Sequence, residues 1–357
     1  MTQATAHRTD RSARLRAAWL ELKSQRKIRQ RDAAALLEVS EGELLATGVG
    51  DGVTRLAGDL REVLKRAPTL GRVMALTRNE SCVHEKTGVY ERIEADGMVG
   101  LTLGADIDLR LFFAHWKHGF AVTEAGEHGA MKSLQFYDGA GQAVHKIFLK
   151  DGADADAYER LVRAAAAPDQ QPGLEVAPRA PRKGERPDAA VDVAGLRAAW
   201  ANLEDTHAFF GLLGKFDVSR TQALRLGGTD LAYPASLDGA RRLLEDVAVT
   251  GLPIMVFAGN PGCIQIHTGP IHNLRPIDHW LNVLDPGFNL HLRTDHIASA
   301  WVVRKPTTDG VVTSLELFDA DGETIAMLFG ERKPGRPELA QWQATVERLF
   351  PAPACTA

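Results

Sequence analysis

The chain contains two related halves, and this internal duplication constrains its fold more than any other feature of the sequence. The pentapeptide LRAAW occurs at Leu15–Trp19 and again at Leu196–Trp200, 181 residues later. The same spacing aligns NESCVHEKTG with NPGCIQIHTG, and SLQFYDGAGQAVHKIF with SLELFDADGETIAMLF. Because solenoid repeats are only about 20 to 50 residues long, each copy is expected to be a whole domain.

A segment rich in proline, charge and small residues separates the copies. We predict a linker at 167–193, with the first repeat at 12–166 and the second at 194–351. Each repeat begins with amphipathic helical patterns and continues with short β-type runs. The stretches YDGAG and DADG are typical of hairpin turns, so consecutive strands should be antiparallel. The expected fold class is α+β, with two tandem repeats that each pack helices against a large antiparallel sheet.

Composition excludes several classes of protein. The 42 basic and 46 acidic residues leave a net charge of -4, so no global positive field indicates a nucleic-acid or acidic-membrane partner. Cys82, Cys263 and Cys355 show no CxxC or zinc spacing, which argues against a disulfide scaffold or a structural zinc. Without a signal-peptide pattern or a run of about 18 apolar residues, the protein is expected to be cytoplasmic and not membrane-embedded.

The segment EDTHAFFGLLGKFDVSRTQALRL, residues 204–226, contains one histidine at the start of a helical pattern. At about 100° per residue, one apolar stripe should face the core. Its members are Phe209, Leu212, Leu213 and Phe216. His207 points to the opposite side, where Gly211 and Gly214 also lie, with Phe210 beside them. Since each glycine inside a helix costs about 0.5 to 1 kcal/mol against alanine, two on one face need a reason.

Two interpretations of this helix face remain open from the pattern alone. A broad flat ligand, such as a porphyrin with its iron bound by imidazole, would need a backbone free of side chains beside His207. Alternatively, the helix ends near Gly211, Gly214 is its C-cap, and His207 is a solvated residue of the first turn.

A second short helix is expected directly after the first. Ser219 and Gln222 have the spacing of a capping box, which places the helix start at Arg220. Arg220 and Arg225 would then lie near the His207 helix, where they could bind carboxylates such as haem propionates. The alternative is that both arginines are solvated surface residues.

The duplication provides an internal comparison for His207. The aligned position in the first copy is Arg26, or Ile28 after a local shift of two residues, and neither is a histidine. If His207 binds haem iron, the chain is therefore expected to hold one haem.

Two further patterns have less support as functional sites. Residues 29–48 resemble a helix-turn-helix unit with Ser40 and Glu43 as a capping box, so a DNA-binding regulator is a remote alternative. The second helix of this unit begins EGELL, which is acidic where DNA phosphates need cations, and we expect no nucleic-acid partner. Five histidines between residues 267 and 296 lack metal-site spacing, so a second metal is not expected.

The chain resembles the HemS/ChuS/HmuS/PhuS family of bacterial cytoplasmic haem-utilisation proteins. In the second half the resemblance rests on DTHAFFGLLGKFDVSRTQAL, LPIMVFAGNPGCIQIHTGPI, WLNVLDPGFNLHLR, VVRKPTTDGVVTSLELFDADG and GERKPGRPE. In the first half it rests on NESCVHEKTGVYE and DLRLFFAHW, so it spans almost the whole chain. The resemblance implies two structurally similar halves, each built on a large antiparallel sheet with helices.

The resemblance also implies the residues of a haem site between the halves. His207 would be the axial ligand of the iron, and Arg110 would approach the opposite, distal face. Three cations would surround the propionates and the haem edge, and one aromatic ring would contact the haem; these are Arg220, Lys305, Arg332 and Phe257. Met327 and Phe329 stand where the family usually has Gln and Tyr, so the distal side should be less polar.

These residues imply a haem b that is bound non-covalently, and they leave two functions in competition. A carrier would accept imported haem from an inner-membrane ABC transporter and deliver it to a haem oxygenase for iron release. An enzyme would open the porphyrin itself with an external reductant or peroxide, and Arg110 would then be catalytic. The less polar distal side given by Met327 and Phe329 favours the carrier.

Overall fold

The computed structural model describes residues 3–126, 129–332 and 335–353, which form two compact units. Unit 1 is built from the chain up to residue 78, from 85–180 and from 259–265. Unit 2 is built from 79–84, 181–258 and the chain from residue 266 onward. Each unit therefore contains one short segment contributed by the other half of the sequence. Cys355 lies outside the described residues.

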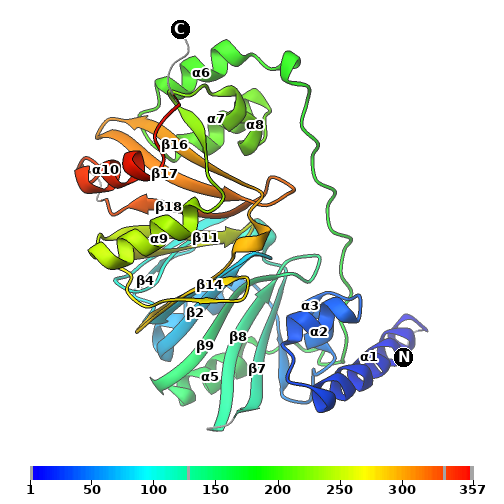
Figure 1. Cartoon of the computed structure of the whole chain (residues 1–357). Helices are drawn as coiled ribbons and strands as arrows, with labels where there is room; N and C mark the ends of the chain where they lie inside the picture. Colours follow the sequence, from blue (N-terminus) through cyan, green and yellow to red (C-terminus); the bar gives the residue numbers. More distant parts are fainter. Residues whose placement is uncertain (1–2, 127–128, 333–334, 354–357) are drawn as a thin grey trace. The chain divides into compact units, whose positions relative to one another are not determined.

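Unit 1 combines N-terminal helices with antiparallel strands (Figure 1). Its strands pair in the order β1-β7-β8-β9-β2, and a smaller group pairs in the order β6-β5-β4. The elements in chain order are α1 (Gln3–Gln25), α2 (Gln30–Leu36), α3 (Glu41–Ala46), β1 (Val53–Leu56), α4 (Leu60–Leu64), η1 (Ala67–Leu70), β2 (Gly71–Arg78), β4 (Arg92–Glu94), β5 (Val99–Leu103), β6 (Asp108–Phe112), η2 (Phe113–His115), β7 (His118–Gly126), β8 (Gly129–Tyr137), β9 (Ala143–Ala153) and α5 (Ala155–Ala165). Strand β3 (Cys82–Gly88) is divided between the two units.

Unit 2 repeats this arrangement. Its strands pair in the order β10-β16-β17-β18-β11 and in the smaller group β15-β14-β13. The elements are η3 (Asp188–Ala190), α6 (Val193–Ala201), α7 (Ala208–Phe216), α8 (Arg220–Leu226), β10 (Ala232–Ala235), α9 (Gly239–Thr250), β11 (Ile254–Asn260), β12 (Cys263–Gly269), β13 (Leu274–Ile277), β14 (Trp280–Asp285), β15 (Phe288–Arg293), η4 (Thr294–His296), β16 (Ser299–Thr307), β17 (Gly310–Phe318), β18 (Thr324–Gly330) and α10 (Ala340–Leu349). Strand β12 is divided between the two units, and the last two residues of β11 belong to unit 1. The expected α+β class, with helices packed on antiparallel sheets in each repeat, is confirmed.

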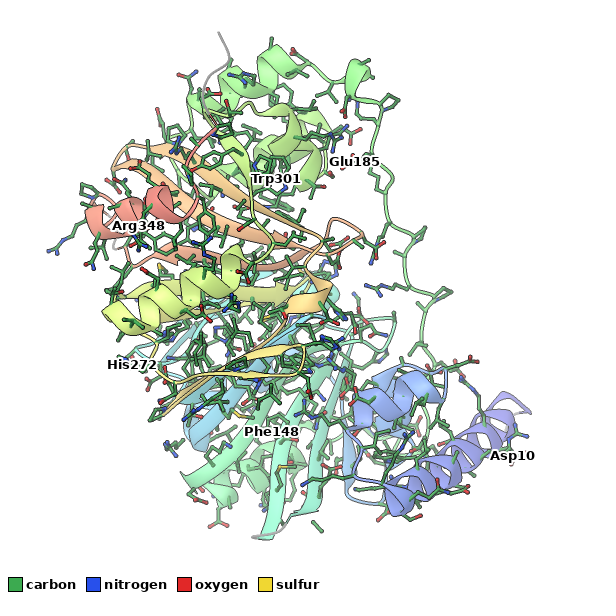
Figure 2. All side chains as sticks on the ribbon, in the orientation of Figure 1. Asp10, Phe148, Glu185, His272, Trp301 and Arg348 are labelled. Carbon is green, nitrogen blue, oxygen red and sulfur yellow. The ribbon has the colours of Figure 1, made fainter. Side chains whose placement is uncertain are left out.

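Helices cover both faces of the five-stranded part of the unit 2 sheet. Helices α9 and α10 lie side by side on one face (Figure 1), where Arg348 of α10 pairs with Asp246 of α9 at 2.7 Å. Helices α6, α7 and α8 share a second core with Val303, Phe318 and Trp301, which is labelled in Figure 2. None of the helices in the described ranges is long and apolar enough to cross a membrane.

The repeated sequence motifs form the same turns in both units. Asp138 Oδ1 accepts hydrogen bonds from two later backbone N–H groups in the β8–β9 turn, at 2.9 and 2.8 Å. Asp319 Oδ1 does the same in the β17–β18 turn, at 2.9 Å each. Asn79 and Asn260 likewise each use Oδ1 to accept two backbone N–H bonds before β3 and β12. The recurring Asp and Asn residues are therefore explained by local turn chemistry.

Helix α3 is not available as a DNA-recognition helix. The predicted capping box is present, since Ser40 Oγ accepts from the Glu43 N–H at 3.2 Å and Glu43 Oε2 accepts from the Ser40 N–H at 2.9 Å. All six residues of α3 are buried, however. A recognition helix must present exposed side chains to the major groove.

A buried polar network crosses the core of unit 1. His145 Nδ1 lies 2.8 Å from Thr77 Oγ1, and its Nε2 lies 2.6 Å from the Tyr90 hydroxyl. Because Thr77 donates its own proton to Gln265 Oε1 at 2.8 Å, it accepts from Nδ1, and Nε2 accepts from Tyr90. Burial lowers the pKa of His145 to about 3, so the ring is neutral near pH 7.

The free energy of unfolding should fall as the pH drops below 6.5, the ordinary pKa of histidine. In the unfolded chain His145 takes up a proton near that pH, whereas in the folded chain it does so only near pH 3. One buried histidine of this kind lowers the free energy of unfolding by about 1.4 kcal/mol per pH unit, or by about 2 kcal/mol between pH 6.5 and 5. Urea unfolding at pH 7 and pH 5 should show wild type losing about 2 kcal/mol more than His145→Gln. Equal losses in the two proteins would show that His145 is protonated in the folded state.

Candidate functional site

His207 stands at the start of α7 on the surface of unit 2. The predicted apolar stripe faces the core, since Phe209, Leu212 and Leu213 are buried. His207 occupies the N-cap position, and 81% of its side chain is exposed. The interpretation in which the helix ends near Gly211 is wrong, because α7 continues to Phe216 and ends where Asp217 adopts a left-handed φ of 52°.

Asp205 fixes the orientation of the His207 ring. Its Oδ1 accepts the backbone N–H of His207 at 2.9 Å and lies 2.7 Å from Nδ1 of the ring. The hydrogen bond from this backbone N–H is the largest effect that lowers the pKa of Asp205, and Arg332 lowers it further. Because an ionised carboxylate only accepts hydrogen bonds, Nδ1 carries the proton. Among the described residues only Asp205 bonds to the ring, so Nε2 keeps its lone pair for a ligand.

Two glycines leave one face of α7 without side chains. Gly211 and Gly214 are exposed, and a Cβ added to either would meet no atom within 4 Å. Neither glycine has a positive φ, so no backbone constraint explains them. Phe210 borders this strip with 81% of its surface exposed. A flat ligand bound to His207 can therefore approach the backbone of α7 closely.

A buried ion cluster lies at the start of α8. The Arg220 guanidinium donates to both oxygens of Glu316, from Nε at 2.6 Å and from Nη2 at 2.7 Å. Lys305 Nζ donates to Glu316 Oε1 at 2.8 Å, and the Ser314 hydroxyl donates to the same oxygen at 3.0 Å. Arg220 also lies over the Phe209 ring at 5.2 Å. The cluster joins α8 to strands β16 and β17.

This ion cluster carries one more positive than negative charge. Burial alone would raise the pKa of Glu316, but Arg220 and Lys305 hold it well below its usual range. Burial lowers the pKa of Lys305 to about 8, against the opposing effect of Glu316. Of the Lys305 side chain only 4% is exposed, against 21% for Arg220. Lys305 therefore does not present its ammonium group at the surface, whereas Arg220 is partly accessible.

Next to Arg220 lies a half-buried apolar strip on the sheet. Phe257 on β11 packs against Phe329 on β18, with ring centroids 4.9 Å apart. Met327 lies opposite Phe257 in the strand register, and its sulfur is 3.3 Å from Arg220 Nη2. The two residues that differ from the expected family pattern, Met327 and Phe329, thus make this part of unit 2 apolar.

Arg332 follows β18 and lies close to the segment that carries His207. Its Nη2 is 3.7 Å from Asp309 Oδ2 in the β16–β17 turn, and 21% of its side chain is exposed. In the same turn, the Thr308 N–H donates to the backbone carbonyl of Glu204 at 3.2 Å. One hairpin tip therefore supports both Arg332 and the chain immediately before Asp205.

Arg110 lies in unit 1, on strand β6. Its Nη1 pairs with Asp108, and it donates to the Leu109 carbonyl at 3.2 Å. About a quarter of the side chain is exposed. Burial raises the pKa of Asp108 although Arg110 acts to lower it. Arg110 is therefore a partly accessible cation with a carboxylate partner in its own strand.

Three of the five histidines between residues 267 and 296 have structural contacts. His267 stacks on Phe288 with ring centroids 3.8 Å apart. His291 Nδ1 lies 2.6 Å from Asn282 Oδ1, and His296 Nδ1 lies 3.0 Å from the Ser81 hydroxyl. In the part of the chain that the structure describes, no three His, Cys, Asp or Glu side chains gather as a metal site.

Five of the six predicted site residues lie in unit 2, and these are His207, Arg220, Phe257, Lys305 and Arg332. Sequence reasoning missed two residues that hold this group in place, Asp205 and Glu316. The signal for Asp205 was its position two residues before a histidine at a helix start, where an Asp side chain can accept nearby N–H bonds. Glu316 had no local signal.

Known proteins resemble this chain over nearly its full length. The sequence model of the haemin-degrading HemS.ChuX domain matches residues 38–165 and 217–349. The hemin transport protein HmuS of Yersinia pestis is 41% identical over 321 residues, which are 90% of this chain and 92% of HmuS. The hemin transport protein HemS of Yersinia enterocolitica is 41% identical over 323 residues, covering 89% of this chain and 92% of HemS.

Solved structures agree with the sequence comparison. Holo-PhuS, a heme-binding protein from Pseudomonas aeruginosa, superposes with a TM-score of 0.93 at 49% identity, covering 96% of this chain and 99% of PhuS. Escherichia coli ChuS, described as a heme oxygenase, gives a TM-score of 0.85 at 38% identity and covers 94% of this chain and 99% of ChuS. The resemblance seen in the sequence is confirmed. The chain belongs to the family of the haemin-degrading HemS.ChuX domain, which occurs in it twice.

Proposed function

We propose that this protein binds imported haem in the cytoplasm and delivers it for iron release. The observation that carries the proposal is the exposed His207 ring, held by Asp205 beside a strip of α7 without side chains. Imidazole is a common axial ligand of haem iron, which supplies the bond that retains the cargo. Relatives described as heme-binding and hemin transport proteins support the same function.

The cations of unit 2 supply the charge that haem propionates need. Arg332 and Arg220 are partly exposed, so in this proposal they contact the carboxylates directly. Lys305 is buried, and it contributes its charge through the cluster around Glu316 instead of by direct contact. Phe257 gives the apolar strip against which the haem edge would pack. The haem is proposed to be haem b, because no CxxC motif for covalent attachment occurs in the sequence.

The proposal includes one haem per chain. Unit 1 has Arg26 or Ile28 where unit 2 has His207. Where α8 begins with Arg220, α3 begins with Glu41, a buried carboxylate paired with Lys146 at 2.5 Å and with Arg78. Unit 1 thus has neither the histidine nor the arginine at the helix start that the proposed site uses. Haem titration should therefore show one equivalent bound, and a second tight site would contradict the proposal.

Arg110 is proposed as the distal residue on the basis of the family resemblance. On haem binding, the Arg110 side chain would leave its partner Asp108 and contact the distal side of the haem instead. Because His207 supplies the bond to iron, Arg110→Ala should weaken haem binding less than His207→Ala does, as measured by absorbance titration. A larger loss in Arg110→Ala would contradict this assignment.

An enzymatic function is the second candidate, since ChuS is described as a heme oxygenase. The apolar side chains of Met327 and Phe329 favour the carrier, because oxygen chemistry at haem depends on a polar distal environment. Proposed partners of a carrier are an inner-membrane haem ABC transporter and a haem oxygenase.

The two functions can be separated with haem-loaded protein. With an external reductant and catalase present, a carrier should keep its Soret band and lose it only when an excess of apo-globin takes the haem. Loss of the band without an acceptor, with release of iron and a defined tetrapyrrole product, would establish the enzyme instead.

A further inference from the structure

The hydrogen bond to the His207 ring comes from a carboxylate and not from a neutral group. Asp205 Oδ1 accepts both the backbone N–H and the Nδ1–H of His207, at 2.9 and 2.7 Å. The same oxygen therefore fixes the backbone, the ring and the tautomer. The turn is further held by the Thr308 N–H bond to Glu204, at 3.2 Å.

A carboxylate at Nδ1 changes the donor strength of Nε2. By accepting the Nδ1 proton, the negative charge raises the electron density of the imidazole and makes Nε2 a stronger donor. A stronger donor beside a negative charge stabilises ferric iron more than ferrous iron, because the ferric ion carries one more positive charge. The geometry at Asp205 thus bears on which oxidation state of haem the site holds.

We propose that Asp205 is a positioning residue that makes the His207 site selective for ferric haem. The inference rests on the proposed function, because it requires His207 to be the iron ligand. It assigns the preference for the oxidised form of haem to a residue that acts through the His207 ring.

The test compares Asp205→Asn with a matched control, Asp217→Asn. The amide that replaces the Asp205 carboxylate keeps an acceptor oxygen but loses the charge. Asp217 lies at the opposite end of α7 in a left-handed conformation that asparagine tolerates, so its replacement removes one charge from the same helix without altering the His207 turn. The readouts are ferric and ferrous haem affinity, the midpoint potential of bound haem, and the iron–histidine stretching frequency of the ferrous complex.

In Asp205→Asn the ferric affinity should fall about tenfold more than the ferrous affinity, the lower end of the usual effect of removing such a partner. A tenfold difference corresponds to a rise of about 59 mV in the midpoint potential. The iron–histidine stretching frequency should decrease, and Asp217→Asn should match wild type.

Equal loss of affinity for both oxidation states would overturn the inference, since a purely structural role of Asp205 would weaken both equally. A wild-type potential and stretching frequency in Asp205→Asn would overturn it as well. Both outcomes leave the proposed function intact if His207→Ala still abolishes the wild-type haem spectrum. If His207→Ala keeps that spectrum, the proposed function fails instead.

Discussion

Replacing Gly211 with leucine is expected to weaken haem binding about 10- to 100-fold while the chain stays folded. In the free protein a side chain at this position meets open space, so it costs the fold nothing. With haem on His207, the leucine would occupy the strip that the porphyrin needs, and such overpacking typically costs about 1 to 3 kcal/mol. Gly214→Leu should behave in the same way. Haem titration and thermal unfolding of the same preparations measure the two effects.

A second variant, Gly211→Ala, adds to this test because it should change helix stability and haem affinity in opposite directions. Gly211→Ala should stabilise α7 by about 0.5 to 1 kcal/mol, since glycine is the poorer helix former. The control is Ala198→Leu, which likewise places a leucine at an exposed position of a helix, here α6. If Gly211→Leu binds haem as tightly as this control, the glycine strip is not the haem surface.

Replacing Glu316 with glutamine is expected to destabilise unit 2 by about 3 to 5 kcal/mol. Glu316 has no exposed surface, and it neutralises part of the charge of Arg220 and Lys305. Without the carboxylate, two cations would remain together, and the Lys305 ammonium is buried. Urea unfolding followed by circular dichroism measures the loss.

A control for Glu316 lies in the turn that follows its strand. Glu323 is exposed, and its side chain lies 3.8 Å from Arg182. Glu323→Gln should change stability by no more than about 0.5 kcal/mol, as is usual for surface substitutions. A Glu316→Gln protein that unfolds at the same urea concentration as Glu323→Gln would show that the buried cluster contributes little to stability.

Local patterns predicted the fold because they occur twice in the chain. The two LRAAW motifs form helices whose tryptophans, Trp19 and Trp200, are 6% and 0% exposed. The Asp-containing turns join antiparallel strands in both units, as their sequences indicate. The apolar period of α7 identified its buried face and placed His207, Gly211 and Gly214 on the other side. Each of these features depends on residues close together in the sequence.

Partners distant in the sequence were not predictable from such patterns. Arg220 and Glu316 are 96 residues apart, and only the packing of α8 on the sheet brings them together. Sequence reasoning therefore treated Arg220 and Lys305 as free cations, whereas the structure pairs both with one carboxylate. The capping box at Ser219 forms only in part for the same reason, since the Gln222 side chain donates to Arg186 and Asp188 instead.

The absorption spectrum of ferric haem bound to His207→Ala tests the central claim most directly, because the claim is that His207 is the iron ligand. His279→Ala is the matched control, since it removes an exposed imidazole elsewhere in unit 2. We predict that His279→Ala keeps the wild-type Soret band and its affinity, and that His207→Ala loses both. A wild-type spectrum and affinity in His207→Ala would contradict the assignment of this site.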